Sequence, residues 1–138
     1  MGSELLHTLS VALAGGAGAA IRYLLTRAVG HLAGEHRRHL ATSAINVLGS
    51  GLLGALVGAL VVLATRSSGG VGDLLALREV VGVGFLGGFT TFSTAVIEAV
   101  EMHRSGRRGA ALAHAVVPLV GALFAAGVGM WLGGTLVG

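Results

Sequence analysis

Three polar residues, Thr42, Asn46 and Ser50, recur at intervals of four in an otherwise apolar part of the sequence. In a helix this spacing places their side chains on one face. In apolar surroundings the Asn46 amide must find hydrogen-bond partners, so the stripe either joins helices or lines a hydrated path. The asparagine NH2 group is a donor, which suits an anion and does little for a cation.

Glycines cluster further along the chain. The segment 82–88 (GVGFLGG) contains four of the 25 glycines, and FTTFST follows it at 89–94. Glycines followed by β-branched and hydroxyl residues make a weak continuous helix. A helix broken inside a membrane is tolerated only where its freed backbone groups face protein or a polar cavity, and such breaks direct carbonyls and half-helix ends at ions. We therefore predict that the helix is broken here.

Charged residues are few in the apolar stretches. Arg22 lies deep enough in the first stretch to be costly in lipid, and a charge there is a functional-site candidate by default. We expect its partner to be an anion, a carbonyl at the break, or interfacial water reached by snorkelling. Glu98 and Glu101 lie one turn apart beside Arg104, which favours a solvated helix end with local ion pairing.

The elements that carry these residues follow from composition. Of 138 residues, 54% are hydrophobic and 11% charged, with a mean hydropathy of +0.86, whereas about a quarter of a soluble domain is charged. Four stretches are long enough to cross a bilayer, which needs about 20 apolar residues. We predict one all-α membrane domain (1–138) with four transmembrane helices, at about 5–29, 40–64, 79–102 and 110–135. The third would be broken near the bilayer midplane. The GxxxG pairs Gly54/Gly58 and Gly129/Gly133 predict close helix packing.

Several function classes are excluded. Without cysteine there is no disulfide, thiolate metal site or thiol nucleophile. All nine basic residues are arginines, and most lie in short connections rather than in a basic and aromatic patch, so they indicate membrane topology and not nucleic-acid binding. There is no Ser/His/Asp arrangement, catalytic carboxylate pair or phosphate-binding loop, and we expect no enzyme.

The arginines also predict an orientation. Those near the ends of the predicted helices divide six to two, Arg27, Arg37, Arg38, Arg104, Arg107 and Arg108 against Arg66 and Arg78. The positive-inside rule then predicts cytoplasmic first and third connections, with both termini outside the cell membrane.

Three stretches resemble one known family. They are GGAGAAIRY (15–23), TSAINVLGSGLLG (42–54) and GFLGGFTTFST (84–94), in order in three successive predicted helices. Together they resemble the small bacterial fluoride channel family of the CrcB type. The third stretch is the most specific, and the resemblance covers the whole chain but weakens in the fourth helix.

The resemblance implies an antiparallel dimer of four-helix subunits that lets fluoride leak passively out of the cell. Its two pores would run along the subunit interface. A structural sodium ion would lie between the two breaks, held by backbone carbonyls that map here to Gly87 and Thr90. The pore asparagine maps to Asn46, the first pore phenylalanine to Phe92 and the vestibule arginine to Arg22.

The chemistry of these positions fits an anion. Fluoride is strongly hydrated, so a selective pore must replace its water shell with close donors. Asn46, Thr42, Ser93 and Thr94 can donate hydrogen bonds. The edge of the Phe92 ring is the positive part of the aromatic quadrupole. A buried sodium ion would offset the carbonyl dipoles at the break and leave a positive field.

The sequence departs from the family pattern in two places. Ala95 stands where the family has a second pore phenylalanine. In the fourth helix, His114 and Pro118 stand at about the positions of a tyrosine and a serine, and residues 109–132 contain no Ser, Thr or Tyr. This subunit therefore contributes fewer of the family's pore-lining side chains to the ion path.

Three interpretations of these departures stay open. An antiparallel homodimer must insert both ways, and a six-to-two arginine bias opposes that, which favours pairing with a paralogous four-helix subunit of opposite orientation. A homodimer with an altered pore and a non-conducting structural subunit are the alternatives. A small four-helix multidrug or cation exporter is disfavoured, because the first helix has no carboxylate after Glu4.

Overall fold

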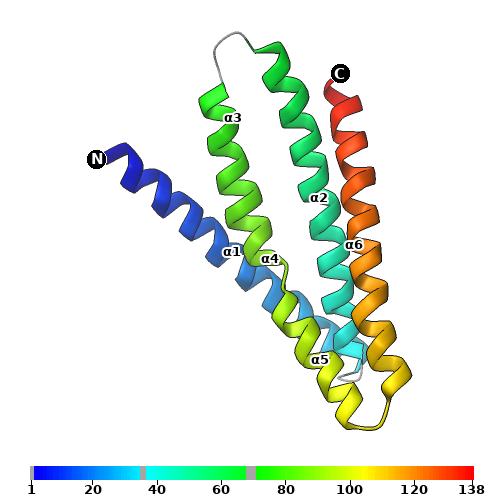
Figure 1. Ribbon diagram of the computed structural model, residues 1–138. Helices are drawn as coiled ribbons and strands as arrows, with labels where there is room; N and C mark the ends of the chain where they lie inside the picture. Colours follow the sequence, from blue (N-terminus) through cyan, green and yellow to red (C-terminus); the bar gives the residue numbers. More distant parts are fainter. Residues whose placement is uncertain (1, 35–36, 68–70) are drawn as a thin grey trace.

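The computed structural model describes residues 2–34, 37–67 and 71–138, and all regular structure in these residues is helical. Its elements are α1 (Gly2–Ala33), α2 (Arg38–Arg66), α3 (Val71–Leu77), η2 (Arg78–Leu86), α4 (Gly87–Phe89), α5 (Phe92–Arg104) and α6 (Arg108–Val137). The elements α3 to α5 form one long helix with a break, so four helices are long and apolar enough to cross a membrane. This confirms the predicted all-α class (Figure 1).

The third long helix begins at Val71, earlier than the predicted residue 79. Its added turns, VGDLLALR, lie between the predicted helices 40–64 and 79–102. Leucine, alanine and arginine are strong helix formers, and Asp73 in the first turn interacts favourably with the helix dipole.

Helices α2 and α6 pack side by side through the predicted GxxxG motifs (Figure 1). A Cβ atom on Gly54 would lie 2.1 Å from the Ala126 carbonyl oxygen, and one on Gly58 would lie 2.0 Å from that of Met130. From the other side, a Cβ on Gly133 would lie 2.0 Å from the Ala55 carbonyl oxygen. The two backbones are therefore in direct contact, which confirms the packing role of these glycines.

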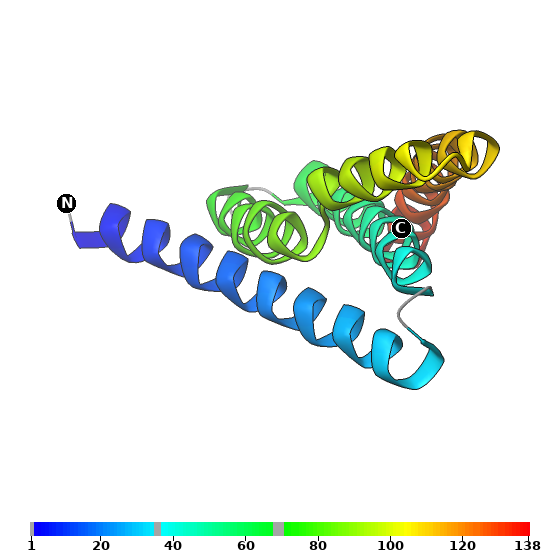
Figure 2. The same cartoon turned by 90° about the horizontal axis from the view of Figure 1, so that it is seen from below.

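Helix α1 crosses the third helix and diverges from the α2–α6 pair (Figures 1 and 2). At the crossing, a Cβ on Gly18 would lie 2.1 Å from the Phe85 carbonyl oxygen, and one on Gly88 would lie 2.1 Å from that of Gly15. The contact continues toward the start of α1, where His7 Nε2 lies 2.6 Å from the Glu79 carboxylate. Most α1 side chains are nevertheless exposed. Leu13 in α1 is 74% exposed.

The break in the third helix lies at Thr90 and Thr91, whose backbones are extended, with φ and ψ of −86° and 159° and of −152° and 122°. This confirms the predicted interruption. Before the break, η2 is a π-helix, in which the Gly87 N–H reaches back to the Gly82 carbonyl. The π-helical turns were not predicted, and such turns frequently occur at functional sites.

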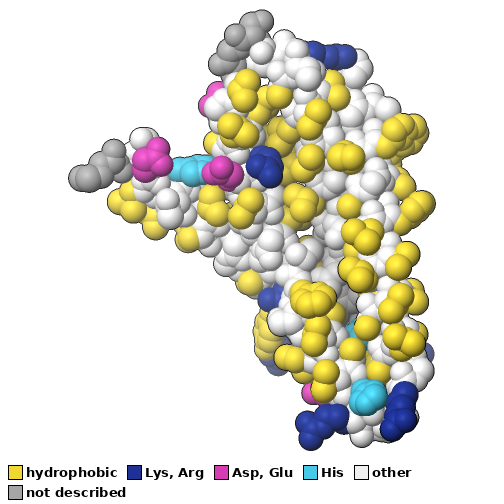
Figure 3. All heavy atoms as spheres, in the orientation of Figure 1, with side chains coloured by type: hydrophobic (Ala, Val, Ile, Leu, Met, Phe, Trp, Pro, Cys, Tyr) yellow, Lys and Arg dark blue, Asp and Glu magenta, His cyan; other side chains and the backbone are white. Residues whose placement is uncertain are grey.

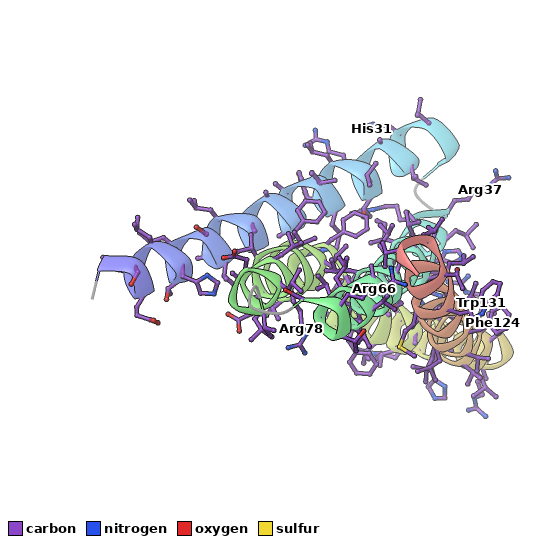
Figure 4. All side chains as sticks on the ribbon, turned by 90° about the horizontal axis from the view of Figure 1, so that it is seen from above. His31, Arg37, Arg66, Arg78, Phe124 and Trp131 are labelled. Atoms are coloured by element: carbon purple, nitrogen blue, oxygen red, sulfur yellow. The ribbon has the colours of Figure 1, made fainter. Side chains whose placement is uncertain are left out.

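Apolar side chains are spread over the whole face seen in Figure 3, as lipid contact requires. On α6, Phe124 and Trp131 point away from the other helices (Figure 4) and are 74% and 67% exposed. The α1–α2 and α5–α6 connections lie at one end of the molecule, and the α2–α3 connection lies at the other (Figure 1). The predicted six-to-two arginine division therefore becomes a difference between the two ends. Which end faces the cytoplasm stays a prediction.

Candidate ion site at the helix break

Asn46 holds the break in its extended form. Its Nδ2 donates to the Thr91 carbonyl at 2.8 Å, and its Oδ1 accepts from the Thr91 N–H at 2.8 Å. In a continuous helix the Thr91 N–H would instead bond to the Gly87 carbonyl. The Asn46 side chain thus replaces one backbone hydrogen bond of the helix. The Gly87 carbonyl thereby loses the N–H donor that it would have in a continuous helix. The sequence predicted that Asn46 needs partners, but it did not predict that the partner is the broken backbone.

Arg22 is anchored to the same break. Its Nε donates to the Gly88 carbonyl at 3.3 Å, so among the three expected partners the structure selects a carbonyl at the break. A guanidinium has five N–H donors, and this contact uses one of them. Arg22 also lines a cavity together with Thr42, Thr91 and Thr94.

Hydroxyl groups gather at the N-terminus of α5. Thr91 Oγ1 lies 3.3 Å from Ser93 Oγ and 3.1 Å from Thr94 Oγ1, and it also accepts from the Thr94 backbone N–H at 3.3 Å. This is an N-cap, which satisfies one of the free N–H groups of the first helical turn. The positive end of the helix dipole and three rotatable hydroxyls make this point favourable for an anion.

The break lies between two cavities. One is lined by Asn46, Ser50, Phe92, Ala95 and His114 among others, and the other is the Arg22 cavity. Thr91 lines both of them. The predicted stripe on α2 therefore divides: Asn46 and Ser50 line the first cavity, and Thr42 lines the second. Phe92 is 78% exposed, so its ring lies largely at the surface of this subunit.

Of the two predicted sodium ligands, Gly87 lies in α4 just before the break and Thr90 lies in the break itself. Gly87 is exposed, and Thr90 is half-buried. Both follow the π-helical segment, where the negative end of the half-helix dipole favours a cation. The loss of its regular partner makes the Gly87 carbonyl chemically suited to a hard cation, which takes oxygen ligands. Two carbonyls from one chain are fewer than such an ion needs.

Glu98 has partners that the sequence did not indicate. Its carboxylate accepts from Thr42 Oγ1 at 2.9 Å and contacts His114 Nε2 at 3.1 Å. The expectation of a solvated helix end is wrong for Glu98, because the side chains of Glu98 and His114 are only 17% and 5% exposed. It holds for Glu101 and Arg104, which are exposed. Thr42, predicted to serve an anion, donates to Glu98 instead. The sequence did contain a signal for this pair, because Glu98 lies in the third predicted helix and His114 lies in the otherwise apolar fourth.

Fold and site together define a small polytopic membrane protein built around a broken helix, with polar donors gathered at the break. A family model described as "CrcB-like protein, Camphor Resistance (CrcB)" matches residues 9–130. The chain belongs to this family, which confirms the resemblance and places it among membrane channels rather than enzymes.

Named relatives agree along nearly the whole chain. A protein of Leifsonia xyli subsp. xyli named "Fluoride-specific ion channel FluC 1" is 44% identical, over 96% of this chain and 90% of its own length. One of Natronomonas pharaonis, "Fluoride-specific ion channel FluC 2", is 39% identical, over 96% of this chain and 98% of its own. Another, "Fluoride-specific ion channel FluC 1" of Corynebacterium jeikeium, is 33% identical over 99% of this chain.

Proposed function

We propose that this chain is a subunit of a passive, fluoride-selective channel of the cell membrane, which lowers cytoplasmic fluoride. The names of its relatives support fluoride as the ion. The observation that carries the proposal is the break clamped by Asn46, with Arg22 and three hydroxyls around it.

In this proposal fluoride loses its water next to these donors. Nδ2 of Asn46 has two N–H groups, and the bond to the Thr91 carbonyl uses one of them. The second N–H, the Thr94 and Ser93 hydroxyls and the edge of the Phe92 ring would then contact the ion. Arg22 would supply positive charge beside the route, in a setting where each donor is worth more than in water.

A structural sodium ion would be held by the Gly87 and Thr90 carbonyls. Since one chain offers only these two, the ion would complete its oxygen shell with the same carbonyls of a second subunit. It would join the two breaks and offset their carbonyl dipoles, without being transported.

The second subunit is proposed to be antiparallel to the first. In the described residues, α1 is covered mainly at its crossing with the third helix, and Phe92 and Gly87 are exposed beside polar groups that are costly in lipid. The arginine bias and Ala95 favour a paralogous partner that supplies the missing phenylalanine. This chain would then insert with both termini outside.

The second candidate function is a non-conducting structural subunit of such a channel. It is favoured by Ala95, which lines the Asn46 cavity, and by α6, which contributes only His114 as a polar side chain to that cavity. A small multidrug exporter is not supported, because the first helix has no carboxylate after Glu4 and instead places the Arg22 cation at the break.

The deciding experiment measures fluoride efflux from liposomes that contain this chain alone or with a candidate four-helix partner, with chloride as the control ion. Selective efflux from the chain alone establishes a self-sufficient homodimer. Efflux only with the partner establishes a heteromer, and Phe92→Ile in this chain then separates a conducting subunit from a structural one. No fluoride efflux in either case contradicts the proposal.

Asn46→Asp tests the site itself. Aspartate has no donor, repels an anion and leaves the Thr91 carbonyl unpaired, so fluoride efflux should be abolished. Thr65→Val, at the exposed end of the same helix, is the matched control and should conduct normally. Undiminished efflux through Asn46→Asp would remove this residue from the pore.

A further inference from the structure

His114 lies at the meeting point of two cavities. It lines the Asn46 cavity, and it also lines a second, mainly apolar cavity that reaches Arg107 at the arginine-rich end of the molecule. The polar side chains of this second cavity are those of His39, Ser43, Arg107 and His114 itself. The residue is 8% exposed. An ion that moved between the break and that end by this route would pass the imidazole.

The groups around His114 define its protonation chemistry. Glu98 of α5 contacts its Nε2 at 3.1 Å, and the His39 ring of α2 meets it edge-on, with centroids 5.6 Å apart and planes at 85°. Arg107, before α6, lines the same cavity as His39. Glu98 is thus the acidic partner in direct contact. An ionised carboxylate can only accept, so beside ionised Glu98 the hydrogen of neutral His114 lies on Nε2. Further protonation then occurs at Nδ1.

That proton changes what the route offers an anion. With neutral His114, the Glu98 carboxylate keeps an uncompensated negative charge beside the path, and a like charge in a low dielectric strongly disfavours the ion. With protonated His114, the pair is neutral overall, and Nδ1–H becomes a new donor. Histidine is the side chain that makes this change at near-neutral pH, between about pH 5 and 8.

We propose that His114 and Glu98 form a proton-controlled step in the anion path, which admits fluoride when His114 is protonated. The proposal rests on the proposed fluoride function and deepens it, because it assigns a regulatory site to residues outside the break. Acid would open the path, and alkali would close it.

The first test is the fluoride current in planar bilayers between pH 5.5 and 8, with the partner subunit present if one is required. Current is the right quantity because neutral HF crosses lipid without carrying charge. On the alkaline side of the histidine titration, the current should fall by up to about tenfold for each pH unit.

Two variants should remove this pH dependence in opposite ways. His114→Gln keeps a donor for Glu98 but leaves the carboxylate charged, so the current should be low at every pH. Glu98→Gln removes the repelling charge, so the current should be high at every pH. A merely structural pair would lose current in both variants. His31→Gln, on exposed α1 and directed away from the other helices, is the control and should keep the wild-type profile (Figure 4).

A second measurement does not require conduction. If fluoride binds better beside protonated His114, reciprocity requires fluoride to favour that protonation. In histidine-labelled protein, NMR titration should show His114 protonated at higher pH in fluoride than in chloride, with His31 unchanged. Equal His114 titration in the two salts overturns the proposal, as does a pH-independent wild-type current. A salt-dependent His114 in a protein without current supports the site while it refutes the proposed channel.

Discussion

Two helix pairs in this protein are held by glycines, but only one of them is complete. Helices α2 and α6 touch along most of their length, with backbone contacts at Gly54, Gly58 and Gly133. Helix α1 meets the third helix along η2 and α4, from Gly84 to Gly88, and diverges from the α2–α6 pair (Figure 2). Helices α2 and α6 therefore cover each other's glycine faces within one chain. Helix α1 and the third helix leave an uncovered surface, and the break lies in it.

The difference shows what a glycine pattern means in a membrane. Lipid is as apolar as leucine, so apolar helix faces alone do not drive association, and close backbone contact must do it. An exposed Leu13 therefore carries no penalty in lipid. Polar groups near the break, such as Arg22 and Thr91, do carry one, and this asymmetry is the physical reason to expect a second subunit at the open pair.

The largest effect should come from a substitution that prevents the backbone contact between α2 and α6. A Cβ on Gly58 would lie 2.0 Å from the Met130 carbonyl, which is backbone and cannot move aside. We expect Gly58→Val to abolish folded protein in detergent, at a cost of about 3 kcal/mol or more. Thermal unfolding by circular dichroism checks this. Gly127→Val, on α6 with open space around its Cβ position, is the control, and equal behaviour of the two variants would contradict the packing role.

A smaller effect is expected at the crossing. Gly88→Ala would place a Cβ 2.1 Å from the Gly15 carbonyl and displace the Gly88 carbonyl from Arg22. We expect a destabilisation of about 1–3 kcal/mol, with helical content kept but fluoride efflux lost. Gly16→Ala, with open space around it in α1, should leave both quantities unchanged. Normal efflux through Gly88→Ala would show that the crossing does not position the break.

Gly87→Val sharpens the comparison, because it separates folding from assembly. Within this chain a Cβ on Gly87 would meet only the Gly82 carbonyl, at 3.8 Å. The residue that α1 approaches closely is Gly88, not Gly87. We therefore expect a chain of normal helical content that no longer dimerises, as measured by light scattering of the purified protein. Normal dimers with normal sodium dependence would count against a sodium ion between two breaks.

The smallest effect should follow Arg22→Gln. Glutamine can still donate to the Gly88 carbonyl, so the break should persist, but the positive charge beside the path is lost. We expect fluoride current to fall by about three- to tenfold, and the difference from wild type to shrink at high salt. Arg27→Gln, one turn further along exposed α1, is the matched control. A current that drops equally at all ionic strengths would mean that Arg22 acts by positioning alone.

Much of the architecture could be predicted because its causes are local. Apolar stretches of about 20 residues, a glycine-rich segment before FTTFST and two GxxxG pairs each act within one helix. These predicted four helices, the break in the third and the close packing of the glycine pairs. The start of the third helix at Val71 was missed, because glycine and serine near it suggested a longer connection.

The partners of the polar residues could not be predicted in this way. Asn46 pairs with a backbone 45 positions away, Thr42 with a carboxylate 56 away, and Arg22 with a carbonyl 66 away. Each pairing depends on which faces of two helices meet, and the composition of a single helix does not contain that information.

The sequence by itself therefore determined that this is a four-helix membrane protein with a broken third helix and a stripe of donors, because lipid imposes those features on each segment separately. Only the tertiary structure decided that Asn46 clamps the break and that Glu98 is paired with His114. Hydropathy acts segment by segment, whereas a buried polar group takes the partner that helix packing brings within hydrogen-bond distance.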